Sequence, residues 1–294
     1  MQTLFSFDAP AAAVGAPSAV GAPLAASMTL VAFDARADFG FLRKPDVNEG
    51  LSLSYNLLHR PALLGLLGAI AGLGGYAGRG QRPAYWTQLG HLRVGVAPLA
   101  YVGTEAAALG DRPRHERGSF AKTVVEYTNT VGYANADGTW ILHESTLIRP
   151  AYRCFVLLDR ANPVEELLYQ RLRHQEAEYL PYLGKNEFAL SWDNVQVLAD
   201  ACPFAGGREF QVVSAFRKTS RVSDAVARAV GLRARQGNAD ELPFLHFERL
   251  PVGFDEHLMQ YRYAEFVYSN ARFQADAPIE DLFGWLDGQA VQLH

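Results

Sequence analysis

The pattern of hydrophobic and polar positions predicts alternating strands and helices over the first two thirds of the chain. Runs rich in β-branched and aromatic residues are typical of strands. The run Pro61–Leu73 is apolar on every side, which is typical of a buried helix that begins at a proline and ends at Gly74-Gly75. Asn162-Pro163 followed by Glu165 indicates the start of a second helix, with Asn162 as its N-cap. Strands are expected at Met28–Ala35, His91–Tyr101, Tyr152–Leu158 and Glu187–Leu198.

A β-hairpin is predicted between the two halves of this pattern. Lys122–Tyr133 and Thr139–Ile148 alternate between apolar and polar residues, and the sequence Asn135-Ala-Asp-Gly138 between them is typical of a tight turn. The resulting order is β-α-β, an inserted hairpin and a second β-α-β, an order that ferredoxin-like and RNA-recognition domains use. We therefore expect an α+β fold in which residues 27–198 form a ferredoxin-like (RRM-like) domain.

The last third of the chain has a different pattern, which is richer in predicted strands. Strands are expected at Phe210–Phe216, Phe244–Leu250 and Tyr263–Tyr268, with a helix around Ser223–Val230. Residues 199–294 are therefore expected to form a smaller β-rich C-terminal region.

The targeting signals and the cysteines indicate a cytoplasmic protein without a membrane anchor. Residues 1–26 are rich in Ala, Pro and Gly and contain no Lys or Arg, which favours a flexible extension over a signal peptide. The apolar run Pro61–Leu73 is too short to span a bilayer. Two cysteines, Cys154 and Cys202, do not make a disulfide framework, so a reducing compartment is expected.

The charge is nearly balanced overall but unevenly placed. The chain has 27 basic and 31 acidic residues, a net charge of −4, and only four of the basic residues are lysines. Residues 208–235 contain seven basic and two acidic residues, whereas residues 237–294 contain three basic and ten acidic residues. Such polarity fits a subunit that meets a polyanion on one face, and an ordinary solvated surface fits it equally well.

Common enzyme signatures are absent from the sequence. It has no glycine-rich nucleotide-binding motif, no P-loop, no serine-hydrolase elbow and no zinc-protease motif. Its two cysteines lack the spacing of a zinc site, so no metal and no cofactor are expected. His143 beside Glu144 has the composition of an acid–base pair, but such pairs on a surface are usually not catalytic.

Basic and aromatic residues lie close together in several segments. Arg43 and Lys44 follow the first strand, and Tyr55, His59 and Arg60 immediately precede the apolar helix. A helix N-terminus beside such groups is an anion site, and a core position for Tyr55 with His59 or Arg60 at the helix cap fits equally well. Two further segments combine groups that bind phosphates and stack on bases. They contain Arg149, Tyr152 and Arg153, and Arg217, Lys218 and Arg221.

Three segments, taken in chain order, resemble one known family. They are Leu42–Tyr76 (LRKPDVNEGLSLSYNLLHRPALLGLLGAIAGLGGY), Ser145–Asp159 (STLIRPAYRCFVLLD) and Gly184–Leu198 (GKNEFALSWDNVQVL). They are similar to blocks of the Cas-five subunits of type I CRISPR Cascade complexes, in the RAMP superfamily. The third block is typical of the I-B branch. The resemblance runs from about Met28 to the end of the sequence and is strongest over the first two thirds.

The resemblance implies an RNA-binding scaffold. Such subunits have a ferredoxin-like N-terminal domain with a β-hairpin thumb, here at about residues 103–148, and a smaller C-terminal β region. They hold the 5′ handle of the guide RNA (crRNA), contact the large subunit and the first Cas-seven backbone subunit, and meet target DNA through the complex. By position, the resemblance places near the handle Arg43, Lys44, Tyr55, His59, Arg60, Arg149 and Arg153. The predicted RNA-binding set is completed by Lys122, Tyr152, Arg217, Lys218 and Arg221.

One branch of the resembled family is catalytic and cuts precursor RNA with a tyrosine and an adjacent Lys-His pair. Tyr55 matches the tyrosine, but Lys122 is followed by Thr123, and the sequence contains no Lys-His pair. Without that general acid we expect a binder, and in the I-B branch a separate Cas-six endonuclease is expected to cut. The alternative is a metal-independent endoribonuclease that uses Tyr55 with His59 or His143.

Overall fold

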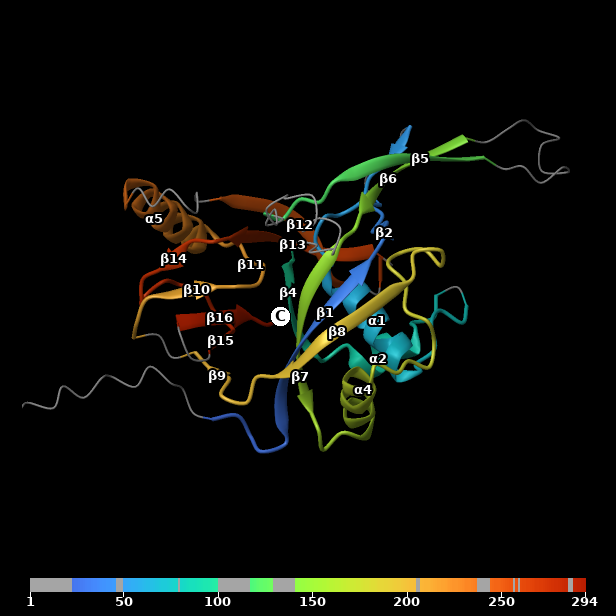
Figure 1. The fold of residues 1–294 in the computed structure, drawn as a ribbon, viewed down its shortest axis with the longest axis horizontal. Helices are drawn as coiled ribbons and strands as arrows, with labels where there is room; N and C mark the ends of the chain where they lie inside the picture. Colours follow the sequence, from blue (N-terminus) through green and yellow to red (C-terminus); the bar gives the residue numbers. More distant parts are fainter. Residues whose placement is uncertain are drawn as a thin grey trace, which may run out of the picture.

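The protein has an α+β fold in which a few helices accompany short strands in mostly antiparallel and mixed sheets (Figure 1). The computed structural model describes residues 23–45, 50–78, 80–99, 117–128, 141–204, 207–236, 244–255, 257–258, 260–284 and 288–294. None of the helices in these ranges is both long and apolar enough to cross a membrane.

A four-stranded antiparallel sheet with the strand order β4-β7-β1-β8 lies at the centre of the fold. Its strands are β1 (Met28–Ala37), β4 (Arg93–Pro98), β7 (Ala151–Asp159) and β8 (Leu190–Val197). Each lies within a few residues of its predicted position. Side chains alternate between the two faces along β1, with Val31 and Phe33 on one face and Leu30 and Ala32 on the other. All four are at most 2% exposed, so both faces of this strand are covered.

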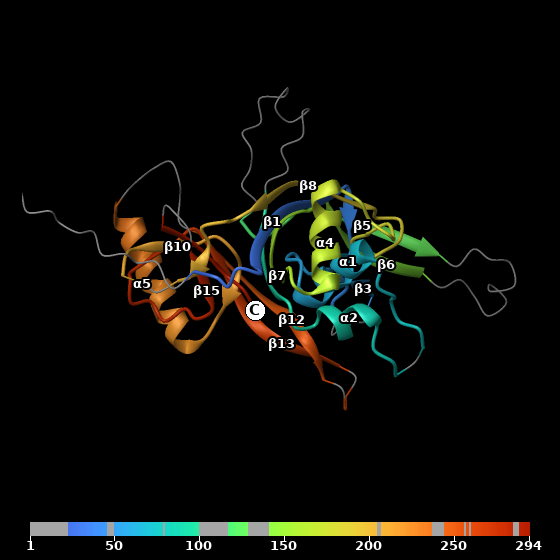
Figure 2. The same ribbon diagram turned by 90° about the horizontal axis from the view of Figure 1, so that it is seen from below.

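Two helices cover the first face of the central sheet (Figure 2). They are α1 (Arg60–Ala71) and α4 (Pro163–His174). Their leucines pack in one core cluster with Val31 and Phe33. α4 begins as predicted, because the side-chain oxygen of Asn162 accepts a hydrogen bond of 2.9 Å from the Val164 N–H.

α1 begins near its predicted start but ends earlier than predicted. His59 is the N-cap, and its Nδ1 accepts a hydrogen bond of 3.3 Å from the Ala62 N–H. The helix ends at Gly72, which has a φ of 79°, and not at Gly74-Gly75. Glycine adopts this left-handed conformation without steric strain, so the first glycine at the end of the apolar run already stops the helix.

A short helix that the sequence pattern does not predict packs against α1. This helix, α2 (Ala84–Leu89), follows Pro83 and has only six residues. Its Leu89 is fully buried, and the side chain of Tyr85 lies against Gly68 of α1. A helix of this length has too few turns to produce a recognisable hydrophobic period.

The predicted hairpin is present in its described part and projects from the body of the molecule in Figure 1. Its strands β5 (Lys122–Thr128) and β6 (Ile141–Ile148) are antiparallel. β6 also pairs with β2 (Phe39–Gly40) and β3 (Leu51–Ser52), which joins the hairpin to the chain that follows β1. The predicted turn at residues 135–138 and most of residues 103–119 lie outside the described residues.

The C-terminal region forms two further sheets and one helix. One sheet has the order β14-β10-β16-β15-β9, and the other has the order β11-β13-β12. The elements are β9 (Cys202–Pro203), β10 (Phe210–Val212), β11 (Phe216–Arg217), α5 (Ser220–Gln236), β12 (Leu245–Asp255), β13 (Gln260–Ser269), β14 (Arg272–Phe273), β15 (Leu282–Gly284) and β16 (Gln289–Gln292).

The strand predicted over Phe210–Phe216 is divided between these two sheets. The chain leaves the first sheet after Val212, and the Ala215 N–H then donates a hydrogen bond of 2.8 Å to the Val96 carbonyl of the central sheet. The predicted strand therefore contains a change of sheet, which the pattern of its side chains does not show. The short strands β9 and β14–β16 have too few residues to be predicted from alternation.

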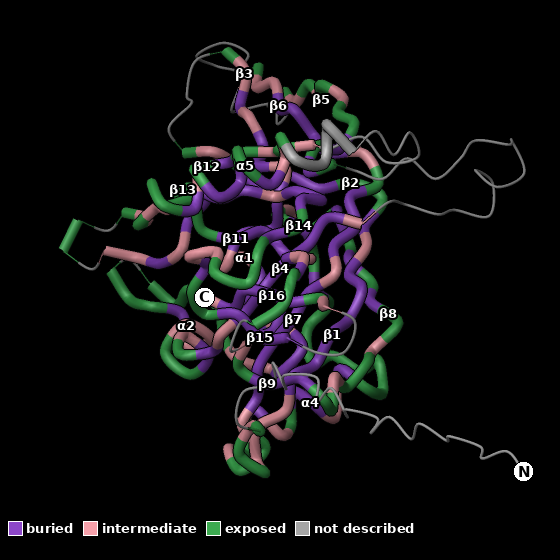
Figure 3. Tube along the Cα trace, turned by 90° about the vertical axis from the view of Figure 1, so that its left-hand side faces the viewer, coloured by how far each residue is buried: buried purple, intermediate pink, exposed green. Residues whose placement is uncertain are grey.

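The C-terminal region covers the second face of the central sheet. Leu30 and Phe155 pack in one cluster with Val291 of β16. Figure 3 shows buried segments at the labels of β1, β7, β15 and β16, and apolar residues of these strands pack together in this cluster. Farther along β1 the same face becomes polar, at Asp34 and Arg36.

Candidate nucleic-acid interface

A buried carboxylate, Glu248 of β12, organises the segment that precedes α1. It is 5% exposed, and its oxygens accept hydrogen bonds from the backbone N–H groups of Asn56 (3.1 Å) and Leu57 (2.9 Å). The Lys44 ammonium lies 3.1 Å from Oε1. Burial alone would raise the pKa of Glu248, but its hydrogen bonds and the charge of Lys44 hold that pKa below its ordinary value. Glu248 therefore remains ionised and neutralises a cation that was predicted to bind RNA.

Two other predicted residues, Tyr55 and His59, lie in the same buried region. Their rings are 5.2 Å apart in an edge-on arrangement, and they are 2% and 7% exposed. The Lys44 ammonium lies 5.0 Å from the centre of the Tyr55 ring. Burial lowers the pKa of His59 to about 4, so this imidazole is neutral at pH 7 and serves as the helix cap. The tyrosine and histidine of the endoribonuclease alternative are thus close together, but protein covers both.

Lys122 and Tyr152 complete this group, which we call the Glu248 cluster: Lys44, Tyr55, Asn56, His59, Lys122, Tyr152 and Glu248. The Tyr152 hydroxyl donates a hydrogen bond of 2.6 Å to the Asn56 carbonyl, and the ring is fully buried. The Lys122 ammonium donates to the side-chain oxygen of Asn56. Both polar groups therefore hold the chain before α1 in place.

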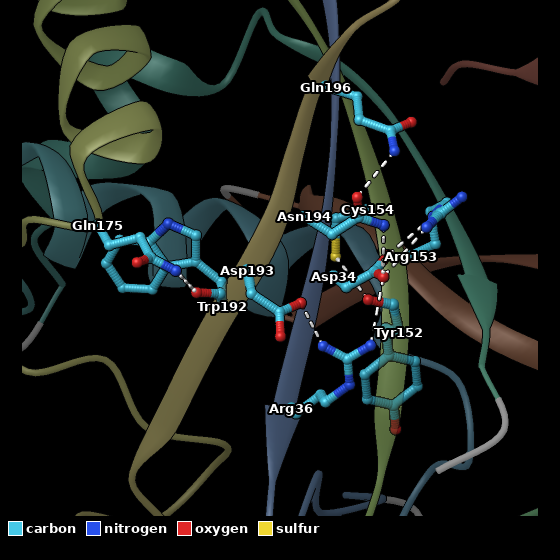
Figure 4. A network of polar contacts seen from close by, with 10 residues as sticks. All are labelled: Asp34, Arg36, Tyr152, Arg153, Cys154, Gln175, Trp192, Asp193, Asn194 and Gln196. Atoms are coloured by element: carbon cyan, nitrogen blue, oxygen red, sulfur yellow. Dashed lines mark hydrogen bonds and ion pairs between the residues drawn. The ribbon is translucent and has the colours of Figure 1, made fainter. Parts of the chain in front are cut away.

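Arg153 forms a salt bridge on the polar part of the sheet face (Figure 4). Its Nε and Nη2 donate to the Asp34 carboxylate at 2.8 and 3.0 Å. Asn194 donates to the same carboxylate at 3.0 Å, and Arg36 bridges it to Asp193. Burial alone would raise the pKa of Asp34, but these hydrogen bonds and the two arginine charges bring it below its ordinary value. The charge of Arg153 is thus largely compensated within the protein.

Of the remaining predicted residues, Arg60 is half-buried at the start of α1, and the others are spread over separate surfaces. Arg43 and Arg149 are exposed near the base of the hairpin, and Arg149 has a φ of 48° where β6 passes into β7. His143 lies on the hairpin, with its Nε2 3.1 Å from the Glu126 carboxylate. Arg217, Lys218 and Arg221 are exposed at β11 and the start of α5.

Tyrosines that were not predicted to bind RNA line a groove along the outer side of α1. We call this cavity of about 660 Å³ the tyrosine groove, and its tyrosines are Tyr76, Tyr85, Tyr179, Tyr182 and Tyr261. Tyr76, Tyr179 and Tyr182 are 59%, 54% and 44% exposed, so their rings remain accessible. Gly65 and Ala69 of α1 also line the groove, and these small side chains leave room above the helix.

The electrostatics of the tyrosine groove suit stacking on a polyanion. Burial and neighbouring tyrosines raise the pKa of Tyr261 to about 12, and burial raises the pKa of Tyr85 further, so these phenols are neutral at pH 7. Arg43 and Lys185 lie at one end of the groove, together with the buried Glu144. The Lys185 ammonium pairs with Glu144 and lies 3.7 Å from the centre of the Tyr127 ring. The groove therefore combines uncharged aromatic rings with the cationic Arg43, whereas the charge of Lys185 is balanced by Glu144.

Sequence signals for the residues that were missed can be identified in hindsight. Glu248 and Leu250 are two positions apart on a predicted strand, so they share a face, and a charge on the apolar face indicates a buried partner. Tyr179-Leu-Pro-Tyr182 is an apolar run outside any predicted helix or strand, which favours an exposed aromatic surface. Among the described residues no group of three or more His, Cys, Asp or Glu side chains is arranged to hold a metal ion.

Comparison with known proteins gives structural similarity at low sequence identity. No family model matches the chain, and no curated protein is similar to it in sequence. A chain of a CRISPR RNA-guided surveillance complex is 16% identical, with a TM-score of 0.42 over 84% of this chain and 92% of that chain. A CRISPR protein from Archaeoglobus fulgidus is 9% identical, with a TM-score of 0.40 over 89% and 97%. A chain of the type III-B Cmr-beta complex bound to cognate target RNA and AMPPnP is 8% identical, with a TM-score of 0.47 over 89% and 99%.

Proposed function

We propose that this chain is a non-catalytic, RNA-binding subunit of a type I CRISPR Cascade complex, acting in the cytoplasm in antiviral defence. In this role it holds the 5′ handle of the crRNA and contacts the large subunit and the first Cas-seven subunit. The proposal starts from the three sequence blocks that resemble the Cas-five family. The first block runs from Leu42 through α1, the second comprises the second half of β6 and all of β7, and the third contains β8.

The arrangement of the central sheet supports a ferredoxin-like domain. In chain order its strands are β1, β4, β7 and β8, and in the sheet the second, third, first and fourth of them lie side by side, all antiparallel. Two β-α-β units with both helices on one face produce this order. The hairpin β5–β6 is inserted between the second and third of these strands, where the resembled family has its thumb.

The observation that carries RNA binding is the tyrosine groove. Exposed aromatic rings bind unstacked bases, and each stacked base contributes about 1–3 kcal/mol. Tyr76 lies in the first sequence block, whereas Tyr179 and Tyr182 lie just before the third, so the groove joins two blocks of the resemblance. Arg43, which also lines the groove, is placed to bind a phosphate of the same strand.

The environment of Tyr55 and His59 supports the non-catalytic part of the proposal. A metal-independent ribonuclease needs its acid and base within hydrogen-bonding reach of one phosphate. Both side chains are buried, and His59 Nδ1 already accepts a hydrogen bond from the helix backbone. His143 lies on the hairpin, paired with Glu126.

The test is the binding and cleavage of RNA by the full chain in EDTA. A labelled RNA with the processed 5′ handle is titrated against the wild type and a Tyr179→Ser/Tyr182→Ser variant, at two salt concentrations. We expect the double variant to bind at least tenfold more weakly, because two stacking surfaces are lost, and the binding of both proteins to weaken with salt. The matched control is Leu167→Ser, which removes a 43% exposed apolar side chain from α4 outside the groove.

Two outcomes contradict the proposal separately. Equal affinities of the wild type and the tyrosine variant contradict the groove as the RNA site. A specific cut in a labelled repeat–spacer precursor contradicts the non-catalytic assignment. In that case Tyr55→Phe shows whether the buried tyrosine takes part.

A further inference from the structure

A second cavity, on the other side of the α1 N-terminus, is lined by arginines. We call this cavity of about 780 Å³ the arginine pocket, and its charged and aromatic lining consists of Arg60, Arg82, Arg217, Arg262, His91, His294, Trp86 and Tyr263. These residues come from α1, α2, β11, β13 and the loops around them. No Asp or Glu side chain is among the described residues that line it. Four arginines thus line one cavity, and none of the described Asp or Glu side chains does.

Arg60 forms the rigid part of the pocket. Its guanidinium donates hydrogen bonds to the carbonyls of His294 (3.1 Å), Leu92 (3.0 Å) and Val252 (3.3 Å), and also to that of Gly90. It lies 5.6 Å from the centre of the Trp86 ring. These main-chain oxygens fix the guanidinium in one position.

Two features indicate that the positive charge of the pocket is concentrated. Burial, followed by the charges of Arg217 and Arg262, lowers the pKa of Arg60, although an arginine stays protonated in proteins. Burial and the charges of Arg217 and Arg60 lower the pKa of His294 to about 3. The buried Nδ1 of His294 has no hydrogen-bond partner among the described residues. The imidazole is therefore neutral at pH 7.

A β-bulge shapes the wall of the pocket. The pairing of β12 with β13 shifts register between Pro251 and Gly253, and Val252 within this shift gives its carbonyl to Arg60. Gly253 lies opposite Arg262, and a Cβ at this glycine would lie 3.1 Å from the Arg262 Nη2. The guanidinium of Arg262 thus rests against bare backbone. Bulges of this kind redirect side chains near functional sites.

We propose that the arginine pocket binds a phosphate-bearing ligand of the nucleotide class. Arg217 and Arg262 are exposed, and their planar guanidinium groups suit bidentate contacts to phosphate oxygens. Arg60 supplies a fixed positive charge behind them, and the rings of Trp86 and Tyr263 offer surfaces for a base. The phosphate belongs either to a free nucleotide or to a nucleic-acid strand. This site is separate from the tyrosine groove and does not depend on the proposed function.

The experiment is calorimetric titration of the full chain, in EDTA, with three probes. These are inorganic pyrophosphate, ATP, and a short single-stranded RNA with a 5′-phosphate. The test variant is Arg217→Glu/Arg262→Glu, which reverses two exposed charges and leaves the Arg60 contacts intact. The matched control is Arg272→Glu, at an exposed position of β14 outside the pocket. We expect at least a tenfold loss of affinity in the double variant and less than a twofold change in the control.

The pattern across the probes identifies the source of the phosphate. Binding of pyrophosphate or ATP that the double variant loses supports a free nucleotide, whereas binding of RNA alone that it loses supports a strand. The proposal is overturned if the wild type binds none of the three, or if the double variant binds as tightly as the wild type. If the double variant melts at a lower temperature, Arg217→Gln/Arg262→Gln repeats the test with a smaller change of charge.

The test separates this proposal from the RNA-handle proposal. The Tyr179→Ser/Tyr182→Ser variant leaves the arginine pocket unchanged, so it is expected to bind pyrophosphate or ATP like the wild type. Loss of handle RNA binding in that variant, with pyrophosphate binding retained, supports both sites. Failure of pyrophosphate, ATP and short RNA to bind, with handle binding through the groove intact, removes only the arginine pocket.

Discussion

The two sides of the α1 N-terminus differ in how their positive charges are balanced. In the Glu248 cluster, Lys44 lies against a buried carboxylate, and Lys122 is bound to a side-chain amide. In the arginine pocket the guanidinium of Arg60 is held by main-chain oxygens, and Arg217 and Arg262 lie close enough to affect its pKa. The first group stabilises the fold, and the second remains available to an anion.

The difference shows that a basic and aromatic composition does not define a binding surface by itself. Both groups combine Lys or Arg with tyrosine or tryptophan, so composition does not separate them. What separates them is Glu248, which β12 places beside the segment before α1. A buried carboxylate turns nearby cations into internal partners, whereas its absence leaves a positive potential.

The largest expected effect comes from removing this carboxylate. Glu248→Gln takes the counter-charge from Lys44 and leaves one of the backbone N–H groups of Asn56 and Leu57 facing an amide N–H₂. Breaking a largely buried ion pair in this way is expected to lower the free energy of unfolding by about 3 kcal/mol. Urea unfolding measures the loss. Glu176→Gln, at an exposed loop position, is the control and is expected to change stability by less than about 0.5 kcal/mol.

The arginine pocket is expected to contain one structural arginine and at least one that is dispensable for folding. Arg60→Gln removes hydrogen bonds to four main-chain carbonyls and is expected to cost about 2 kcal/mol of stability. Arg217→Gln is expected to leave stability unchanged within about 0.5 kcal/mol, because the side chain is exposed and repels Arg60. Urea unfolding of both variants tests this division. A large loss in Arg217→Gln is the outcome that contradicts it.

Acidification is expected to lower the stability of the fold through His59, which belongs to the Glu248 cluster. Its pKa is about 4 in the folded chain and 6.5 ordinarily, so between these values the unfolded state binds more protons. Stability is therefore full above pH 6.5 and falls as the pH drops toward 4. From pH 7 to pH 5 the loss is about 2 kcal/mol, and His294, whose pKa is about 3, adds a loss in the same direction.

The variant His59→Asn isolates the contribution of this histidine. Asparagine keeps an N-cap oxygen for the Ala62 N–H and does not titrate. The variant is expected to lose about half as much stability as the wild type between pH 7 and pH 5, in urea unfolding at both values. An unchanged pH dependence would show that His59 already protonates in the folded state at pH 5.

The smallest expected effects come from alanine substitutions at two glycines of α1. An added Cβ at Gly68 would lie 2.3 Å from the Tyr85 Cβ of α2, whereas at Gly65, on the groove side, the nearest atom is 3.7 Å away. Gly68→Ala is expected to destabilise by about 1 kcal/mol, since overpacking exceeds the gain in helix propensity. Gly65→Ala is expected to stabilise by up to about 1 kcal/mol. Thermal unfolding measures the stability change of each variant. Changes of the same sign in the two variants would contradict the packing described here.

Some elements could be predicted because their signals are local. β1 follows from β-branched and aromatic content, and α4 follows from its N-cap and proline within three residues. The hairpin strands follow from alternation. The end of α1 was placed too late, because Gly72, Gly74 and Gly75 lie within four residues at the end of the apolar run and the sequence does not show which one stops the helix.

In the predicted site too, features that depend on neighbouring residues were predicted, and features that depend on distant residues were missed. The alternative that Tyr55 packs in the core and that His59 caps α1 was visible in the sequence and is what the structure contains. The groove tyrosines and Glu248 were missed. Glu248 and Asn56 are 192 positions apart in the sequence. A pattern within a short stretch of sequence does not reveal a contact between residues so far apart.

The sequence by itself determined the longer strands and helices and where charge is concentrated, because these properties depend on neighbouring residues. The tertiary structure alone decided the order of the strands, the pairing of Lys44 with Glu248 and the meeting of Arg60, Arg217 and Arg262 around one cavity. Each of these depends on contacts between distant residues. Burial then decides which cations receive a carboxylate and which are left for a ligand.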